Sequence, residues 1–205
     1  MTEKEKMLAG EIYDANYDGE LLAERARAKE LCHEHNLLLP SQTKERERIL
    51  RSLLGKTGGR FLIEQPFVCD YGYNIEIGER FYANHGLVIL DGNKVTFGDD
   101  VFIGPGCGFY TAGHPLDAER RNKGLEFALP ITVGNSVWFG GNVCVLPGVR
   151  IGDNAVIGAG SVVTKDIPPG VVAAGNPCRV IKENLKDSYG ARSGLRRGGG
   201  CFLKN

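Results

Sequence analysis

The chain has 205 residues, with 25 Lys and Arg against 25 Asp and Glu, so its formal net charge at pH 7 is zero. Without an overall positive field, neither nucleic acid nor an acidic membrane surface is an expected partner. Because no stretch is apolar enough for a membrane span or a secretory signal, and the six cysteines match no C-x-x-C or zinc spacing, we expect a cytoplasmic protein without a metal.

Residues 1–57 are predicted to form a helical segment. Thr2 followed by Glu5 is typical of a capping box and predicts a helix to about Ile12. Two more helices are expected over residues 20–35 and 44–54, where apolar residues recur between charged ones. These three helices carry many charged and few apolar residues. We therefore expect them to pack on another surface rather than to enclose a core of their own. His33 and His35 lie among charges and are predicted to be solvated.

Residues 58–181 are predicted to form a parallel β-helix. A large apolar residue, usually followed by glycine, opens each hexapeptide at Val133, Phe139, Val145, Ile151, Ile157 and Val163, with the same phase at Phe97 and Ile103. A smaller residue follows four positions after each opener. Short repeats of this kind bury their apolar side only by stacking, whereas simple strand alternation gives no reason for glycine at every sixth residue. Glycine is expected there because the corner is tight: a side chain would obstruct the backbone, or the residue would need a φ that is unfavourable for other residue types.

One insertion interrupts the repeat, at residues 110–130. It contains Gly113-His114-Pro115 and a polar run from Leu116 to Glu126. Insertions in solenoids project from one edge and commonly carry the binding surface, so we expect the functional site here. The basic, glycine-rich tail, residues 182–205, is predicted to be largely disordered after a short helix. A solvated tail is favoured there over an RNA-binding one, because aromatic residues are nearly absent.

Several motifs together resemble the maltose/galactoside O-acetyltransferases, a family of hexapeptide-repeat enzymes. The resemblance rests on residues 3–11 (EKEKMLAGE), 69–74 (CDYGYN), 82–84 (YAN), 113–115 (GHP), 135–141 (NSVWFGG), 158–168 (GAGSVVTKDIP) and 175–179 (GNPCR). It implies a mainly-β, left-handed parallel β-helix, and a homotrimer with active sites between subunits. It also implies acetyl transfer from acetyl-CoA to a sugar hydroxyl of the maltose, glucose or galactoside type, by direct attack.

Such a transfer needs a base for the hydroxyl proton, and imidazole has a suitable pKa. His114 matches the family's base, and Glu126 is the candidate partner that sets its tautomer. The resemblance implies acceptor contacts by Asp18, Arg27, Asp70, Tyr82 and Asn84, although Asp14 competes with Asp18. Gly92 stands where galactoside enzymes typically carry an acidic residue, which leaves the acceptor's identity open.

For the acetyl-CoA, the resemblance implies a second set of residues. Gly141 matches a position whose backbone N–H approaches the thioester, and Arg179 matches an arginine near the nucleotide phosphates. The remaining implied contacts are Trp138, Ala159, Thr164 and Lys165.

Three alternatives stay open at this point. The acceptor could be a non-sugar compound such as a xenobiotic, or the solenoid could be a non-catalytic scaffold. A zinc hydratase on the same fold would need three histidine ligands, and only His85 and His114 are suitably placed in the sequence.

Overall fold

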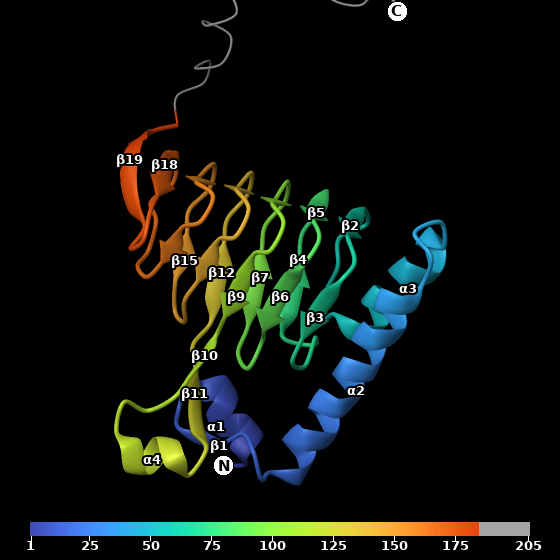
Figure 1. The fold of residues 1–205 in the computed structure, drawn as a ribbon, viewed down its shortest axis with the longest axis vertical. Coiled ribbons are helices and arrows are strands. Elements are labelled where there is room, and N and C mark those ends of the chain that lie inside the picture. The colour runs from blue at the N-terminus through green and yellow to red at the C-terminus, as the bar shows by residue number, and fades with distance from the viewer. Residues whose placement is uncertain (185–205) are drawn as a thin grey trace, which may run out of the picture.

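Three parallel β-sheets wrap around one core in the computed structural model, which describes residues 1–184 (Figure 1). Sheet 1 contains β2 (Phe61–Ile63), β5 (Phe81–Ala83), β8 (Phe102–Ile103), β13 (Trp138–Phe139), β16 (Val156–Ile157) and β18 (Val171–Ala174), with β19 (Arg179–Glu183) antiparallel at its end. Sheet 2 contains β3 (Phe67–Cys69), β6 (Leu87–Leu90), β9 (Gly108–Tyr110), β14 (Cys144–Val145) and β17 (Val162–Val163). Sheet 3 contains β4 (Ile75–Ile77), β7 (Val95–Phe97), β12 (Ile131–Val133) and β15 (Arg150–Ile151). The chain visits the three sheets in turn, and the predicted left-handed parallel β-helix is confirmed.

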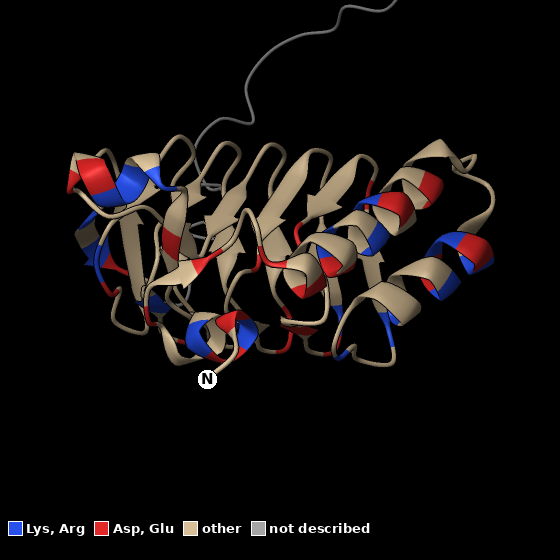
Figure 2. Cartoon of the chain, turned by 90° about the horizontal axis from the view of Figure 1, so that it is seen from below, with Lys and Arg blue, Asp and Glu red and all other residues tan. Residues whose placement is uncertain are grey.

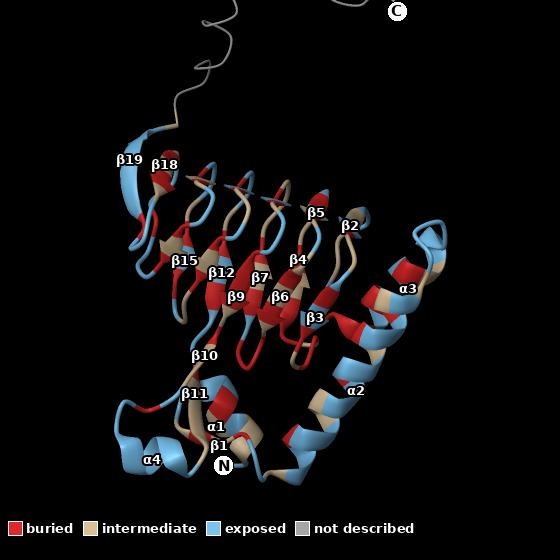
Figure 3. Ribbon diagram, in the orientation of Figure 1, coloured by how far each residue is buried: buried red, intermediate tan, exposed pale blue. Residues whose placement is uncertain are grey.

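The hexapeptide openers fill this core as predicted. All eight openers, and the smaller residues four positions later, are buried (Figure 3). The rings of Phe81, Phe97, Phe109 and Phe139 stack edge to face along the axis, with centroids 5.0 to 5.2 Å apart. Each coil is therefore held by the coils above and below it, which is what a short repeat requires.

The glycine after each opener is explained by a close approach rather than by φ. A Cβ on Gly104 would lie 2.7 Å from the backbone of Gly140, and a Cβ on Gly134 would lie 2.8 Å from the backbone nitrogen of Asp153. Left-handed φ values occur two positions later, at residues such as Ser136 and Asn154, both at 56°. Glycine thus lets successive coils stack, and the residue two positions later makes the corner.

Two N-terminal helices, α2 (Gly19–Leu37) and α3 (Thr43–Leu53), cover the first coils, whereas α1 (Glu3–Ala9) packs beside β1 (Tyr13–Asp14) and β11 (Leu125–Ala128) (Figure 1). The Thr2–Glu5 capping box is confirmed, but α1 ends earlier than predicted because Gly10 adopts a left-handed φ of 76° and caps it. The prediction for His35 was wrong. His35 lies on α2 with its side chain fully buried, and burial lowers its pKa.

The insertion folds together with the N-terminus into what we call the arm, formed by α1, β1 (Tyr13–Asp14), β10 (Ala112–Gly113), α4 (Ala118–Asn122) and β11 (Leu125–Ala128). β11 pairs antiparallel with both β1 and β10. The arm projects from one side of the coils (Figure 1). A separate apolar cluster joins it to the coils and α2, made of Met7, Tyr13, Ala15, Leu21, Tyr71 and Ala128.

Charged residues are concentrated on the helices, whereas the strands carry few (Figure 2). None of the helices between residues 1 and 184 is long and apolar enough to cross a membrane. Lys182 and Glu183 belong to β19 rather than to a helix, and Asn184 follows the strand. Residues 185–205 of the predicted disordered tail lie outside the described residues.

Candidate active site

A cleft of about 450 Å³ lies where the arm leaves the coils. Its floor follows the ends of neighbouring strands of sheet 2, where Leu90 pairs with Tyr110. The side chains that line it come from α2, the coils and the arm: Arg25, Asp70, Leu90, Tyr110, Ala112, Gly113, His114, Glu126, Leu146 and Pro147. The cleft therefore brings together His114, Glu126 and Asp70, three of the predicted site residues.

Hydrogen bonding fixes the tautomer of His114. Its Nδ1 lies 2.9 Å from the carbonyl oxygen of Leu125, and because a carbonyl only accepts, Nδ1 carries the proton. The neutral ring then has an unprotonated Nε2 that can accept a proton. Gly113, the neighbour of His114, leaves room for the paired strand, since a Cβ there would lie 2.6 Å from the ring of its partner Phe127 on β11.

Glu126 does not orient the imidazole in the way we predicted. The Leu125 carbonyl occupies Nδ1, and Glu126 faces the other nitrogen, with Oε1 4.0 Å from Nε2. The hydroxyl of Tyr13 donates to the second oxygen, Oε2, at 2.9 Å. The pairing of β1 with β11 sets Tyr13 opposite Glu126, so the N-terminus holds this carboxylate in place.

A buried carboxyl supports the floor of the cleft. Asp91 is fully buried, and its Oδ1 accepts hydrogen bonds from the backbone N–H groups of Asp70 and Tyr71, at 3.0 and 2.9 Å. Burial raises the pKa of Asp91 to about 7. Burial also raises the pKa of Asp70, while the nearby positive charges of Arg25 and Lys29 oppose that rise. Asp91 thus positions the backbone that presents Asp70 to the cleft.

Two of the predicted acceptor contacts lie outside this cleft. Asp18 is the N-cap of α2 and accepts from the N–H of Leu21 at 2.9 Å, and Arg27 is exposed and lines a smaller cavity beside Tyr71 and Tyr73. The residue of α2 that lines the cleft is Arg25, which the sequence analysis missed. Helical spacing was a signal that could have separated the two arginines, because residues two apart, such as Arg25 and Arg27, point to opposite faces of a helix. Asp14, the competing aspartate, lies in β1 opposite Leu125.

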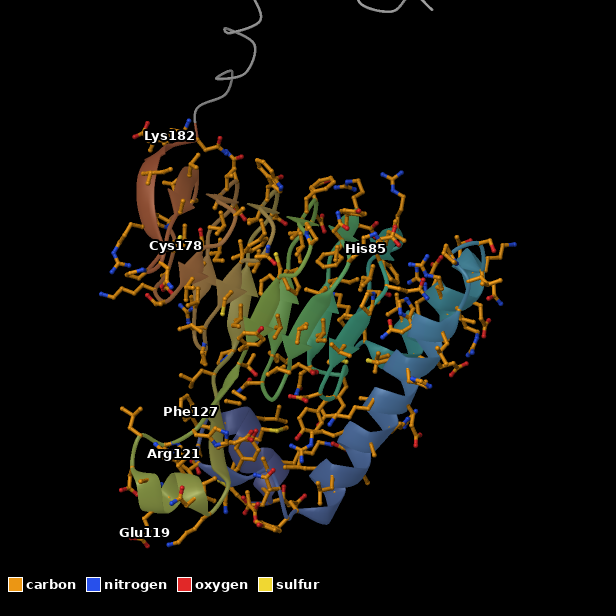
Figure 4. The ribbon with its side chains drawn as sticks, in the orientation of Figure 1. His85, Glu119, Arg121, Phe127, Cys178 and Lys182 are labelled. Carbon is orange, nitrogen blue, oxygen red and sulfur yellow. The ribbon has the colours of Figure 1, made fainter. Side chains whose placement is uncertain are left out.

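Tyr82 and Asn84 lie on another side of the coils. Tyr82 belongs to β5 of sheet 1, and Asn84 directly follows that strand. Asn84 Oδ1 accepts from the N–H of His85 at 2.7 Å. Figure 4 places His85 there, away from the arm that carries Phe127 and Arg121. One chain therefore does not bring Asn84 to His114.

The predicted acetyl-CoA contacts form two strips. The first strip lies on sheet 2. Phe109, Val145 and Val163 are paired across neighbouring strands, so the residues that follow them, Tyr110, Leu146 and Thr164, form one row. Thr164 extends this row beyond the cleft, and Lys165 is the next residue. The other strip includes Trp138, which is 56% exposed on sheet 1, and Gly141, whose backbone N–H has no hydrogen-bond partner in residues 1–184. Ala159 stacks beside Gly140 at the same corner, and Arg179 is exposed on β19.

Comparison with known proteins identifies the family. Residues 6–58 match the maltose acetyltransferase hexapeptide capping motif, and residues 130–165 match the bacterial transferase hexapeptide (six repeats). The galactoside O-acetyltransferase of Escherichia coli (strain K12) is 46% identical over 186 residues, covering 90% of this chain and 91% of that protein. The chain belongs to the maltose/galactoside O-acetyltransferase family. The resemblance seen in the sequence is thereby confirmed, and the chain is an acetyltransferase rather than a scaffold.

Solved structures of this family share the fold over nearly the whole described chain. A maltose O-acetyltransferase from Clostridium difficile 630 has a TM-score of 0.89 and 52% identity, covering 91% of this chain and 99% of its own. A galactoside acetyltransferase in complex with coenzyme A has a TM-score of 0.87 and 45% identity, covering 90% of this chain and 92% of its own. Within residues 1–184, no group of three or more His, Cys, Asp or Glu side chains is arranged to hold a metal ion.

Proposed function

We propose that this acetyltransferase moves the acetyl group of acetyl-CoA to a sugar hydroxyl, with His114 as the general base. The observation that carries the proposal is the hydrogen bond from His114 Nδ1 to the Leu125 carbonyl, which leaves Nε2 unprotonated in the cleft. Nε2 takes the hydroxyl proton as the acceptor oxygen attacks the thioester carbonyl. The tetrahedral intermediate then expels CoA as its thiolate, and the imidazolium transfers to it the proton taken from the acceptor hydroxyl.

The free N–H of Gly141 supports a role at the thioester. An oxyanion forms on the carbonyl oxygen during the attack, and a fixed backbone donor stabilises that charge. Since Gly141 lies on a different strip from His114, a second copy of the chain would complete the site. We propose that this copy belongs to a homotrimer and supplies its Tyr82, Asn84, Trp138, Gly141 and Ala159, with Thr164, Lys165 and Arg179 holding the distal part of acetyl-CoA. A monomer in sedimentation analysis would contradict this assembly.

Asp70 and Arg25 support a polar acceptor. Both line the cleft with His114 and Glu126, and a sugar offers hydroxyls that can donate to a carboxylate or accept from a guanidinium. Asp14 pairs with Leu125, but its carboxylate accepts from the backbone N–H groups of Asn16 and Tyr17. Asp18 and Arg27 contribute from α2 only if the helix shifts on binding. We place the reaction in the cytoplasm, because the five cysteines in the described part of the chain are free thiols.

A CoA-release assay tests this function. Acetyl-CoA is supplied with glucose, maltose, galactosides, chloramphenicol or serine, for the wild type and for His114→Ala. We expect release that depends on a sugar, and a fall of about 10²- to 10⁴-fold in kcat for the variant with acetyl-CoA binding unchanged, since that is the usual contribution of a general base. Near-wild-type turnover by the variant would contradict the role of His114, and release with chloramphenicol or serine alone would contradict the sugar acceptor.

A further inference from the structure

We infer that Glu126 selects acceptors that carry a second hydroxyl within one or two carbons of the hydroxyl that is acetylated. This inference rests on the proposed function and narrows its acceptors to sugars whose second free hydroxyl lies within one or two carbons of the hydroxyl that is acetylated. It assigns Glu126 a contact with the acceptor in place of the orienting role considered from the sequence.

The spacing of two acceptor atoms points to a pair of hydroxyls. Glu126 Oε1 and His114 Nε2 are 4.0 Å apart, too far for a direct hydrogen bond. Neither atom has another hydrogen-bond partner among residues 1–184, and both residues line the same cleft. An acceptor with neighbouring hydroxyls can donate one proton to Nε2 and the other to Oε1 at normal hydrogen-bond lengths, whereas a simple alcohol leaves the carboxylate without a partner.

The carboxylate is held in place for this contact. The side chain of Glu126 is 18% exposed, and Tyr13, which donates to its Oε2, is 2% exposed. Burial and the adjacent Glu126 charge raise the pKa of Tyr13, so its hydroxyl stays protonated as a donor. One oxygen is thus fixed by the protein, and the other is presented to the cleft.

Gly92 makes room for this arrangement. A Cβ at position 92 would lie 3.2 Å from the Tyr13 hydroxyl and 3.2 Å from the Cβ of Ala128, both on the arm. Both separations are tighter than an ordinary van der Waals contact. Gly92→Ala would therefore press on the Tyr13 hydroxyl, the donor to Glu126, by a few tenths of an ångström without touching the acceptor itself.

The test compares matched sugars and matched variants. Wild type, Glu126→Ala, Glu126→Gln and Tyr13→Phe are assayed with a methyl glycoside and with its series of monodeoxy analogues. Glu119→Gln serves as the control, because Glu119 lies on α4 of the arm and its carboxylate instead binds the exposed Lys123. Thermal melting checks that each variant is folded, and acetyl-CoA binding checks that the donor site is intact.

We expect Glu126→Ala to lose about 10- to 100-fold in kcat/KM on the parent sugar, the range of a hydrogen bond to a charged group. For one deoxy analogue, the kcat/KM of the wild type should fall by a similar factor relative to the parent sugar. On that analogue, the kcat/KM of Glu126→Ala should be less than about threefold below that of the wild type. Glu126→Gln should retain part of the selectivity, and Tyr13→Phe should follow Glu126→Ala in direction with a smaller loss. Equal losses for Glu126→Ala on every analogue, or no loss on any, would overturn the inference while the proposed function stands. A wild type that acetylates no sugar would overturn the proposed function and this inference with it.

Discussion

The coils and the arm of this protein are stabilised in different ways. In the coils, one continuous core runs from the α2 and α3 contacts to β18, and every opener repeats the packing of its neighbour. In the arm, strands of two to four residues enclose a small cluster around Met7 and Tyr13, and polar contacts converge on His114. The comparison indicates that the coils supply stability and a fixed floor, whereas the arm sets the chemistry. Changes in the two regions should therefore have separable effects.

The largest expected effect is a loss of stability in the coils. Phe97 is 5% exposed and packs edge to face between Phe81 and Phe109. Phe97→Ala should lower the free energy of unfolding by about 3–5 kcal/mol, the usual range for a buried phenylalanine. Urea unfolding measures this, with Leu22→Ala as the control because Leu22 is 42% exposed on α2. Equal losses for the two variants would contradict the view that the stacked rings carry the stability of the solenoid.

The next effect depends on pH and comes from Asp91, beneath the cleft. The pKa of Asp91 is raised to about 7 in the folded protein, so as the pH rises the unfolded chain loses this proton before the folded protein does. Between about pH 4 and pH 7, Asp91 therefore destabilises the fold increasingly. Asp91→Asn removes that titration and keeps an oxygen for the N–H groups of Asp70 and Tyr71. The variant's free energy of unfolding relative to wild type should therefore rise by a few kcal/mol across this range, at about 1.4 kcal/mol per unit of pKa shift. A difference that is the same at pH 4.5 and pH 7.5 would contradict the prediction.

The smallest effect distinguishes two arginines of α2. Arg25 lines the cleft, whereas Arg27 faces a different cavity. Arg25→Ala should raise the KM for the acceptor about tenfold, which corresponds to about 1.4 kcal/mol, while Arg27→Ala should change it by less than about twofold. Steady-state kinetics at saturating acetyl-CoA measure both. A larger rise in KM for Arg27→Ala than for Arg25→Ala would contradict this assignment and show that α2 presents Arg27, rather than Arg25, to the acceptor.

The coils could be predicted from the sequence because their pattern is local and repeated. The hexapeptide phase at Val133 to Val163 indicated which side chains are buried before any contact was known. The three helices were predicted to within a few residues for the same reason. His35 was the exception. Its neighbours in sequence are charged, but it lies on the face of α2 that packs against the coils.

The arm could not be predicted in the same way. β1 has only two residues, and its partner Glu126 is more than a hundred residues further along the chain, so no local pattern marks the pairing. The sequence did identify His114 and Glu126 as a pair in one insertion. It did not reveal that the Leu125 carbonyl holds the imidazole, because a backbone carbonyl leaves no signature in residue type. The contribution of Tyr13 and Gly92 depends equally on a tertiary contact.

The arm holds His114 with Nδ1 protonated, which leaves Nε2 free to act as a base. Nitrogen–proton correlation spectra of protein labelled with ¹⁵N-histidine, compared with His114→Asn to assign the signal, report this tautomer directly. At a pH where the imidazole is neutral, we expect a protonated Nδ1 and an unprotonated Nε2 for His114. A protonated Nε2 with a bare Nδ1 would contradict this expectation, because Leu125 would then have no donor and the cleft would have no base.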